Sequence, residues 1–329
     1  MLTRLTACAL LWVLALPVDA SPVADATEPT PPVGRRELRL HDPSTFVRDT
    51  DGTWWLFATG NQIISARSRD LVTWTYHDPV LAAPPTWAIE VAPGNTKHHY
   101  WAPDIIKVGD LYHLYYSVSE FGKNTSAIAL ATSPVLDPAA PGYGWTDRGI
   151  VIRSGPGKDY NAIDPALLLD KGRLWMSFGS FWGGIFLVEL DRSTGLLRDP
   201  DAAPHRIAWS REIEAPTLYR RGKYIYLFVN EGICCRGKDS TYRVRVGRSR
   251  SITGPFVDDQ GRDLLEAGGR EVLATEGNFI GPGHIGLFKD DSGKEWASVH
   301  FYDGTRDGAP HLALRRLGWT SDGWPEILD

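Results

Sequence analysis

Cysteine, methionine and an excess of positive charge are what this 329-residue sequence lacks. It has three cysteines, and the two outside the N-terminal segment are adjacent, a spacing that matches no zinc-binding motif. Its net charge of −5 gives no basic surface of the kind that binds nucleic acid. P-loop, GxSxG and HExxH motifs are missing as well, so nucleotide hydrolysis, α/β-hydrolase chemistry and zinc proteolysis have no support.

Long apolar runs are also missing beyond the first twenty residues, so the sequence predicts no membrane-spanning helix. Residues 1–20 have a basic start, a short apolar stretch and the small-residue end Val18-Asp19-Ala20, which is typical of a signal peptide. Residues 21–37 are proline-rich and read as a tether, and residues 38–329 as one folded domain. We therefore expect a soluble protein that is secreted or periplasmic, and we expect it to be a monomer.

The adjacent cysteines are Cys234 and Cys235, in the stretch NEGICCRGKDS. In an oxidising compartment they can form a disulfide between neighbours, or they can remain two thiols. We favour a structural role for the pair.

Aromatic residues, in contrast, are plentiful, with 13 Trp and 12 Tyr. Such rings can fill a hydrophobic core, and they can also stack on sugar rings. Composition does not choose between the two.

One pattern occurs five times along the chain: a short apolar strand, a glycine turn and an alternating aromatic strand. A third strand follows each pair, and a weaker fourth segment often follows that, as in VTWTYHDPV, GWTDRGIVI and ITGPFVD. The pairs are HDPSTFV with DGTWWLFAT, WAPDIIKV with GDLYHLYYS, AIDPALLL with KGRLWMSFGS, IEAPTLYR with RGKYIYLFVN, and GPGHIGLF with SGKEWASVHF.

Five units of three to four strands predict an all-β fold, a five-bladed β-propeller. A β-sandwich also has many short strands, but it would not repeat a polar marker at the first strand of every unit. The first strand of a blade lines the central channel, so the markers should converge there. They are Asp42, Asp104, Asp164, Glu214 and His284.

Several acids gathered at one axis suit the hydrolysis of a glycosidic bond. One carboxylic acid protonates the leaving oxygen, and a carboxylate activates water or attacks directly. The acid must keep its proton near neutral pH, and burial or a further negative charge nearby achieves this. Asp42, Asp164 and Glu214 can fill these places. The alternative is that each acid caps its own turn, which five repeats at the blade starts argue against.

The chain from about residue 38 to 325 resembles glycoside hydrolase family 43, and within it most closely the endo-α-1,5-L-arabinanases. The resemblance implies that Asp42 is the general base, Glu214 the general acid, and Asp164 the residue that raises the pKa of the acid and orients it. It also implies inversion at the anomeric carbon, and it gives Asp104 no catalytic role. The matching motifs are HDPS, YWAPDI, NAIDP, GSFWGGI, IEAPTLY, CCRGKDSTY, GPGH and the C-terminal GWP.

His284 in GPGH matches a histidine that, in arabinanases, helps to hold one central metal ion, commonly calcium. The resemblance thus implies calcium as a cofactor. Calcium prefers oxygen ligands, however, so a hydrogen-bonded channel histidine remains the alternative.

The same motifs suggest substrate contacts at the blade starts and loops. Of these, FWGG is the strongest candidate, because paired glycines would let a sugar chain approach the backbone closely. Each aromatic residue could equally be part of the core. The predicted contacts are Asp42, Trp101, Phe121, Gly122, Asn161, Ala162, Ile163, Asp164, Ser180, Phe181 and Trp182.

The sequence therefore predicts an endo-acting enzyme whose substrate is arabinan, a polysaccharide of pectin side chains. An exo-acting relative, an α-L-arabinofuranosidase or β-xylosidase, would share the three acids and differ mainly in the loops around the groove. A non-catalytic sugar-binding propeller is a third alternative, which the retention of all three acids argues against.

Overall fold

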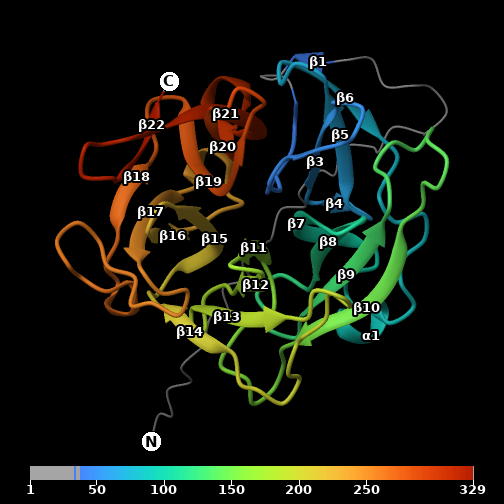
Figure 1. Ribbon diagram of the computed structural model, residues 1–329, viewed down its shortest axis with the longest axis horizontal. Coiled ribbons are helices and arrows are strands. Elements are labelled where there is room, and N and C mark those ends of the chain that lie inside the picture. The colour runs from blue at the N-terminus through green and yellow to red at the C-terminus, as the bar shows by residue number, and fades with distance from the viewer. Residues whose placement is uncertain (1–32, 35–37, 329) are drawn as a thin grey trace, which may run out of the picture.

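Five antiparallel β-sheets surround a central axis in the computed structural model, which describes residues 33–34 and 38–328 (Figure 1). The predicted five-bladed β-propeller is thus confirmed. The predicted signal peptide and most of the predicted tether lie outside the described residues. The exception is the two-residue strand β1, which pairs with β6 and so adds a strand to the first blade from ahead of residue 38.

The first two blades contain five strands each. The first blade has the order β1 (Val33–Gly34), β6 (Thr73–His77), β5 (Ile64–Ser68), β3 (Trp54–Ala58) and β2 (Val47–Arg48). The second has β10 (Thr146–Arg153), β9 (Ala127–Ser133), β8 (Leu111–Val118), β7 (His99–Val108) and β4 (Gly60–Asn61).

The remaining three blades contain four strands each, in sequence order. The third has β11 (Ala166–Asp170), β12 (Arg173–Phe178), β13 (Ile185–Leu190) and β14 (His205–Ala208). The fourth has β15 (Ile213–Arg221), β16 (Tyr224–Glu231), β17 (Arg243–Ser249) and β18 (Arg270–Leu273). The fifth has β19 (Phe279–Lys289), β20 (Glu295–Asp303), β21 (Ala309–Trp319) and β22 (Pro325–Leu328).

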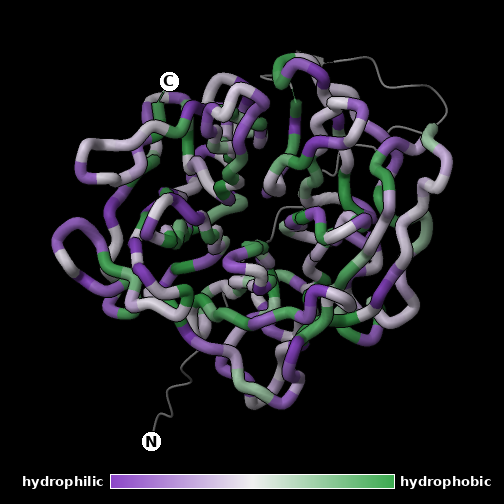
Figure 2. The backbone as a smooth tube through the Cα atoms, viewed as in Figure 1, coloured by the Kyte–Doolittle hydropathy of each residue, from purple (hydrophilic) through white to green (hydrophobic). Residues whose placement is uncertain are grey.

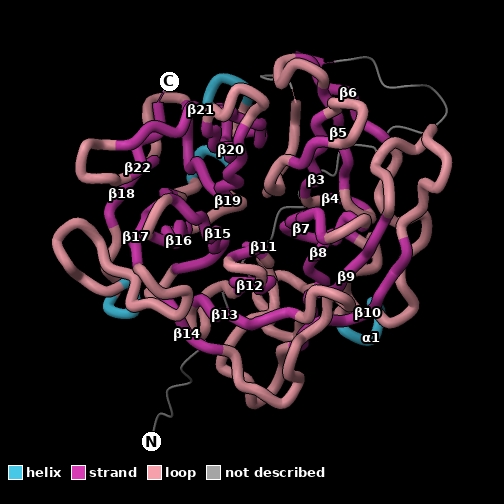
Figure 3. The backbone as a smooth tube through the Cα atoms, viewed as in Figure 1, coloured by secondary structure: helices cyan, strands magenta, loops and turns pink. Residues whose placement is uncertain are grey.

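Helical structure is short throughout the described residues, as the sequence predicts (Figure 3). None of these helices is long and apolar enough to cross a lipid bilayer. They are α1 (Ala88–Val91) and the 3₁₀ helices η1 (Gly237–Asp239), η2 (Leu264–Glu266) and η3 (Gly304–Arg306).

The core consists of hydrophobic clusters, one between each pair of neighbouring blades. Successive side chains of a strand point to opposite faces of its sheet, so a middle strand supplies two clusters at once. On β3, for example, Trp55 and Phe57 pack toward the second blade, whereas Trp54 and Leu56 pack toward the fifth. Because both faces are covered, these strands are apolar almost throughout, and hydrophilic residues are found along the peripheral loops (Figure 2).

The ring closes between the first and fifth blades without the exchange of a strand, within the part of the chain described here. Arg39 forms an isolated β-bridge with His311, and the Leu312 amide donates a hydrogen bond to the Leu38 carbonyl at 3.0 Å. Phe288 of the fifth blade stacks on Phe46 of the first, with ring centroids 4.6 Å apart. Packing and this one backbone bridge therefore contribute to the seam, as do polar contacts from His300 and Tyr302 to the first blade.

The predicted fourth strand of the fourth blade, ITGPFVD, is wrong. Val257 of that segment forms only isolated bridges with Arg248 and Asp263, and the outer strand is β18, further along the chain. The segment contains Pro255, whose backbone nitrogen carries no hydrogen and so cannot donate a hydrogen bond to a neighbouring strand.

Candidate active site

The inner end of each blade carries one residue with a positive φ angle. These residues are Asp42 (53°), Ala102 (45°), Asp164 (58°), Ala215 (50°) and His284 (53°). Four of them precede a proline. Left-handed backbone is uncommon for residues other than glycine, and it concentrates at functional sites. This backbone position, rather than the acid itself, is what the five blades repeat.

Two of the five predicted marker residues therefore do not occupy this repeated backbone position. Asp104 comes two residues after Ala102, and Glu214 comes one residue before Ala215. Sequence spacing alone did not reveal the offset, because an alanine in this position carries no chemical signal.

Asp104 instead ties three blades together. Its carboxylate accepts the Thr45 amide of the first blade at 3.0 Å and the Leu167 amide of the third at 2.8 Å. Burial raises the pKa of Asp104 to about 6, even though these hydrogen bonds lower it. This geometry gives Asp104 a structural contact, and its lack of a catalytic role stays a prediction.

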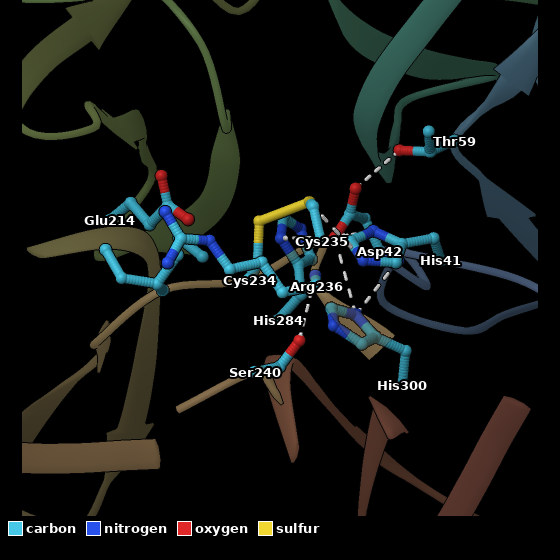
Figure 4. Close-up of a disulfide and its surroundings, with 12 residues drawn as sticks. His41, Asp42, Thr59, Glu214, Cys234, Cys235, Arg236, Ser240, His284 and His300 are labelled. Carbon is cyan, nitrogen blue, oxygen red and sulfur yellow. Dashed lines mark hydrogen bonds and ion pairs between the residues drawn. A yellow bond between two sulfur atoms is a disulfide. The ribbon is translucent and has the colours of Figure 1, made fainter. Parts of the chain in front are cut away.

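The carboxylate of Asp42 is held by side chains from the first and fifth blades. Its Oδ1 lies 2.8 Å from Nδ1 of His41, and its Oδ2 accepts a hydrogen bond from the Thr59 hydroxyl at 2.6 Å. The same hydroxyl accepts the Ala102 amide at 2.8 Å, which joins the second blade to this network. The Asp42 amide donates to Nδ1 of His300 at 3.2 Å. Backbone and carboxylate are thus both fixed (Figure 4).

These surroundings keep Asp42 ionised. Burial alone would raise its pKa, but His41 above all, together with His284 and His300, lowers the pKa of Asp42 far below its ordinary value. An ionised carboxylate can accept a proton, as a general base must.

Asp164 and Glu214 are both buried, at 7% exposure each, and are linked through the backbone. Asp164 Oδ2 accepts the amide of Ala215, the residue next to Glu214, at 3.2 Å. Asp164 itself is anchored by its own amide, which donates to the Ser117 hydroxyl at 3.0 Å. The Ser180 hydroxyl donates to Glu214 Oε2 at 2.6 Å.

The pKa values of this pair move in the direction opposite to that of Asp42. Burial raises the pKa of Glu214 to about 7, with Asp42 adding to the rise and the Ser180 hydrogen bond opposing it. Burial and the negative charges of Glu214 and Asp42 raise the pKa of Asp164 well above its ordinary value. The pair therefore retains a proton near neutral pH. A protonated carboxylic acid and an ionised carboxylate are the two groups that acid–base hydrolysis needs.

His284 lies within this site. Its amide donates to the Asn230 side chain at 2.9 Å, and its Nδ1 is 3.6 Å from Asp42 Oδ1. His41, Asp42 and His300 also bring two imidazoles and a carboxylate within 4.8 Å of one another. This set is rich in nitrogen, whereas calcium prefers six to eight oxygen ligands. The described residues thus fit calcium only as an ion that keeps most of its own water.

The predicted substrate contacts from the second blade differ in exposure. Phe121 is 80% exposed in the loop after β8, next to the exposed Gly122, whereas Trp101 on β7 is half-buried. The loop reaches the third blade, because the Ser126 hydroxyl donates to the Asn161 side-chain oxygen at 2.7 Å. Asn161 is buried, so this hydrogen bond orients its side chain.

Ala162 and Ile163 are both buried. Ala162 is fully buried, and its amide donates to the Ser154 hydroxyl at 2.9 Å, so a contact between its side chain and the substrate stays a prediction. Ile163 is 7% exposed, and its carbonyl accepts the Gly179 amide.

The FWGG loop after β12 presents Trp182, which is 44% exposed, and the half-buried Phe181. The Phe181 amide donates to the Ile213 carbonyl at 2.7 Å, next to Glu214. The predicted reason for the two glycines was wrong. A Cβ on Gly183 would lie 2.3 Å from the Asp159 carbonyl oxygen, so the protein's own backbone occupies the space expected for a sugar chain.

Four residues around Asp42 were missed by the sequence analysis: His41, Thr59, His300 and Tyr302. His41 stands inside the quoted HDPS motif. His300 and Tyr302 are two apart on β20, and such spacing places both side chains on one face of a strand. Nothing in the sequence relates that face to Asp42, since the fifth blade meets the first only when the ring closes.

A five-bladed propeller whose axis holds one ionised carboxylate and a buried carboxyl pair that retains a proton belongs to a recognisable class, the propellers that hydrolyse glycosidic bonds. Comparison with known proteins agrees. The family model for glycosyl hydrolases family 43 matches residues 30–325. This chain belongs to that family and is a glycoside hydrolase.

Characterised relatives include both modes of attack. The chain is 42% identical to the extracellular exo-α-(1→5)-L-arabinofuranosidase ArbA of Cellvibrio japonicus, over 89% of this chain and 88% of that protein. It is 40% identical to the extracellular endo-α-(1→5)-L-arabinanase 1 of Bacillus subtilis, over 87% of each. The structure of the Cellvibrio cellulosa α-L-arabinanase complexed with arabinohexaose superposes with a TM-score of 0.84 at 42% identity, covering 88% of this chain and 95% of that one.

Proposed function

We propose that the protein is an endo-acting arabinanase that hydrolyses α-1,5-L-arabinofuranosyl linkages with inversion. The observation that carries the proposal is the opposite protonation of Asp42 and the Asp164–Glu214 pair around one axis. The activities that name the two relatives support arabinan as the substrate.

In the proposed reaction, Asp42 is the general base. Held by His41 and Thr59, its carboxylate accepts a proton from the water that attacks the anomeric carbon. Glu214 is the general acid and gives its proton to the departing glycosidic oxygen. One water attacks in one step from the face opposite the leaving group, so the configuration inverts.

Asp164 supports the acid in two ways. Its hydrogen bond from the Ala215 amide fixes the backbone next to Glu214. Its carboxyl group shares the buried environment, in which two adjacent negative charges are unfavourable, so one proton stays on the pair. This supports the role of pKa modulator and orienting residue.

Exo attack is the second candidate, because the relative at 42% identity is an exo-arabinofuranosidase. The two modes differ in their first products. A chromatographic time course on linear debranched arabinan should show mixed oligosaccharides from the outset. Release of a single short product from the chain end would favour the exo enzyme, and binding of arabinan without hydrolysis would favour a sugar-binding propeller.

Calcium at His284 is part of the proposal. The ion would be held by the His284 imidazole and by water, and it would supply positive charge beside Asp42. The same time course, run after chelation and again with added calcium, tests it: activity should fall and then recover. Unchanged activity after complete removal of metal would leave His284 as a channel histidine.

Export and a monomeric state complete the proposal. The relatives from Cellvibrio japonicus and Bacillus subtilis are both named as extracellular enzymes, which supports secretion. A polysaccharide substrate too large to enter a cell gives such an enzyme a reason to work outside it.

A further inference from the structure

Cys234 and Cys235 form a disulfide between neighbours, in the loop that joins β16 to β17. In the view of Figure 4, this disulfide lies between Glu214 and the pair His41–Asp42. Cys235 is exposed, and its Sγ is 3.8 Å from Nε2 of His41. The proposed reaction gives the disulfide no part.

A chain of hydrogen bonds leads from this disulfide to the carboxylate of Asp42. The Cys235 amide donates to the Tyr302 hydroxyl oxygen at 2.7 Å. That hydroxyl is 2.6 Å from His41 Nε2, and His41 Nδ1 is 2.8 Å from Asp42 Oδ1. Each link therefore has the length of a strong hydrogen bond.

The direction of the chain follows from its two ends. Nδ1 of His41 faces an ionised carboxylate, so it must carry the proton that it donates to Asp42. The Tyr302 oxygen already accepts the Cys235 amide, which leaves its own hydrogen free for Nε2 of His41. A disulfide sulfur has no hydrogen, so the Sγ contact cannot replace that donor. Tyr302 thus sets the tautomer and the ring orientation of His41.

The disulfide controls the first donor in this chain. It closes a small ring through the peptide between the two cysteines, and the Cys235 amide belongs to that ring. Cys235 also has a φ of 64°, a conformation that costs a non-glycine residue about 1–3 kcal/mol unless its surroundings impose it. Without the disulfide, the amide is free to turn away from Tyr302.

We propose that Cys234–Cys235, Tyr302 and His41 form a positioning relay that orients the carboxylate of Asp42 toward the attacking water. The inference rests on the proposed function, since it gives Asp42 the role of general base. None of the three is a catalytic residue in the sense of touching the reacting atoms.

Kinetics of three variants on debranched arabinan test the relay: Cys234→Ala/Cys235→Ala, Tyr302→Phe, and the two combined. We expect each of the first two to lower kcat about 10-fold with little change in KM, because a 1 Å misplacement can cost on the order of 10² in rate. If both act through one chain, the combined variant should be no worse than Tyr302→Phe alone, since linked residues are not additive.

Reduction of the folded wild-type protein provides a test without mutation. Dithiothreitol converts the disulfide to two thiols and is itself oxidised to its cyclic disulfide. We expect kcat to fall to the level of the double-alanine variant, and that variant should not respond to the reagent. Apart from Cys8 in the predicted signal peptide, the sequence has no other cysteine for the reagent to act on.

Each other outcome overturns the relay. Unchanged kcat in the reduced wild type would show that the disulfide does not position Asp42. Fully additive losses would show independent structural effects, and a rise in KM alone would make the disulfide a substrate-contacting surface. If the wild type hydrolysed no arabinan, the proposed function would fail instead, and that result is distinct from all three.

Discussion

The same chemical group is driven to opposite protonation states within one site. Asp42 is surrounded by His41, His284 and His300, which favour its charge, and the Thr59 hydroxyl bonds to it. Glu214 is buried, a single hydroxyl from Ser180 bonds to it, and burial dominates its pKa. The partners of each carboxyl group therefore separate the proposed base from the proposed acid.

At this scale, Glu214→Gln should lower kcat by about 10²–10⁴, because the amide keeps the shape of the side chain but has no proton to give. Steady-state release of reducing ends measures the loss, and calorimetry with arabino-oligosaccharides should show that binding persists. Glu212→Gln, two residues away, is the matched control and should retain full activity. A fully active Glu214→Gln variant would remove the general acid from the mechanism.

The pH dependence of kcat/KM should report the same group. Glu214 acts only while protonated, so activity should fall as pH rises through about 7. The Ser180 hydrogen bond lowers the pKa of Glu214, and therefore Ser180→Ala should move this limb to higher pH. Ser193→Ala, on an exposed turn, serves as the control. A limb that stays in place in Ser180→Ala would mean that another group controls it.

Among the elements, the loop between β12 and β13 directly supports Glu214. Its Ser180 forms an isolated bridge with Glu214, so the third blade helps to hold the acid of the fourth. The close fit of Gly183 against the Asp159 carbonyl oxygen sets the path of this loop.

Gly183→Ala should consequently lower the free energy of unfolding by about 1–3 kcal/mol, since its Cβ would meet backbone that cannot move aside easily. Urea denaturation measures the change. Gly155→Ala adds a Cβ with nothing within 4 Å and should alter stability by less than about 0.5 kcal/mol. Equal free energies of unfolding for the two variants would show that the loop accommodates the added Cβ without loss of stability.

Elements of the fold were largely predictable, and contacts between distant blades were not. Both-sided burial makes middle strands such as β3 and β16 apolar, so the repeats were visible in the sequence. The outer strand β18 was misplaced, because an outer strand has weaker packing and leaves a weaker pattern. Asp42 and Asp164 stood out as acids directly before proline, and Glu214 as an acid two residues before one. His300 and Tyr302, in contrast, gained meaning only from the closed ring.

Over the whole molecule, the blades are joined by apolar packing and by a few buried polar contacts across their inner ends. Asp104 is one of these, since it reaches from the second blade to the Thr45 and Leu167 amides. Between the fourth and fifth blades, the Thr217 hydroxyl donates a hydrogen bond to the Ile285 carbonyl at 2.6 Å. Such contacts fix how neighbouring blades are rotated.

Asp104→Asn should therefore destabilise the protein by about 1–3 kcal/mol, because an amide nitrogen cannot accept the second of the two backbone hydrogen bonds. The variant should also lose the part of the pH dependence of stability that Asp104 causes. The pKa of Asp104 is raised to about 6, so in the wild type its contribution to stability declines as pH rises from 3.8 through 6.

Thermal or urea unfolding across that pH range measures both effects. Asp110→Asn, on an exposed turn, is the control and should match the wild type. If Asp104→Asn showed wild-type stability at every pH, the hydrogen bonds from Asp104 to the first and third blades would contribute nothing to stability.

The seam between the first and fifth blades also has a consequence for how the protein is made. A ribosome produces the first blade before the fifth, and the partners of Leu38 and Phe46 are Leu312 and Phe288, which follow only after three further blades. Until then Trp54 and Leu56 have no neighbouring sheet to cover them. The growing polypeptide must therefore expose one apolar face of its first sheet while the three intervening blades are made, and this is the face that a chaperone would shield.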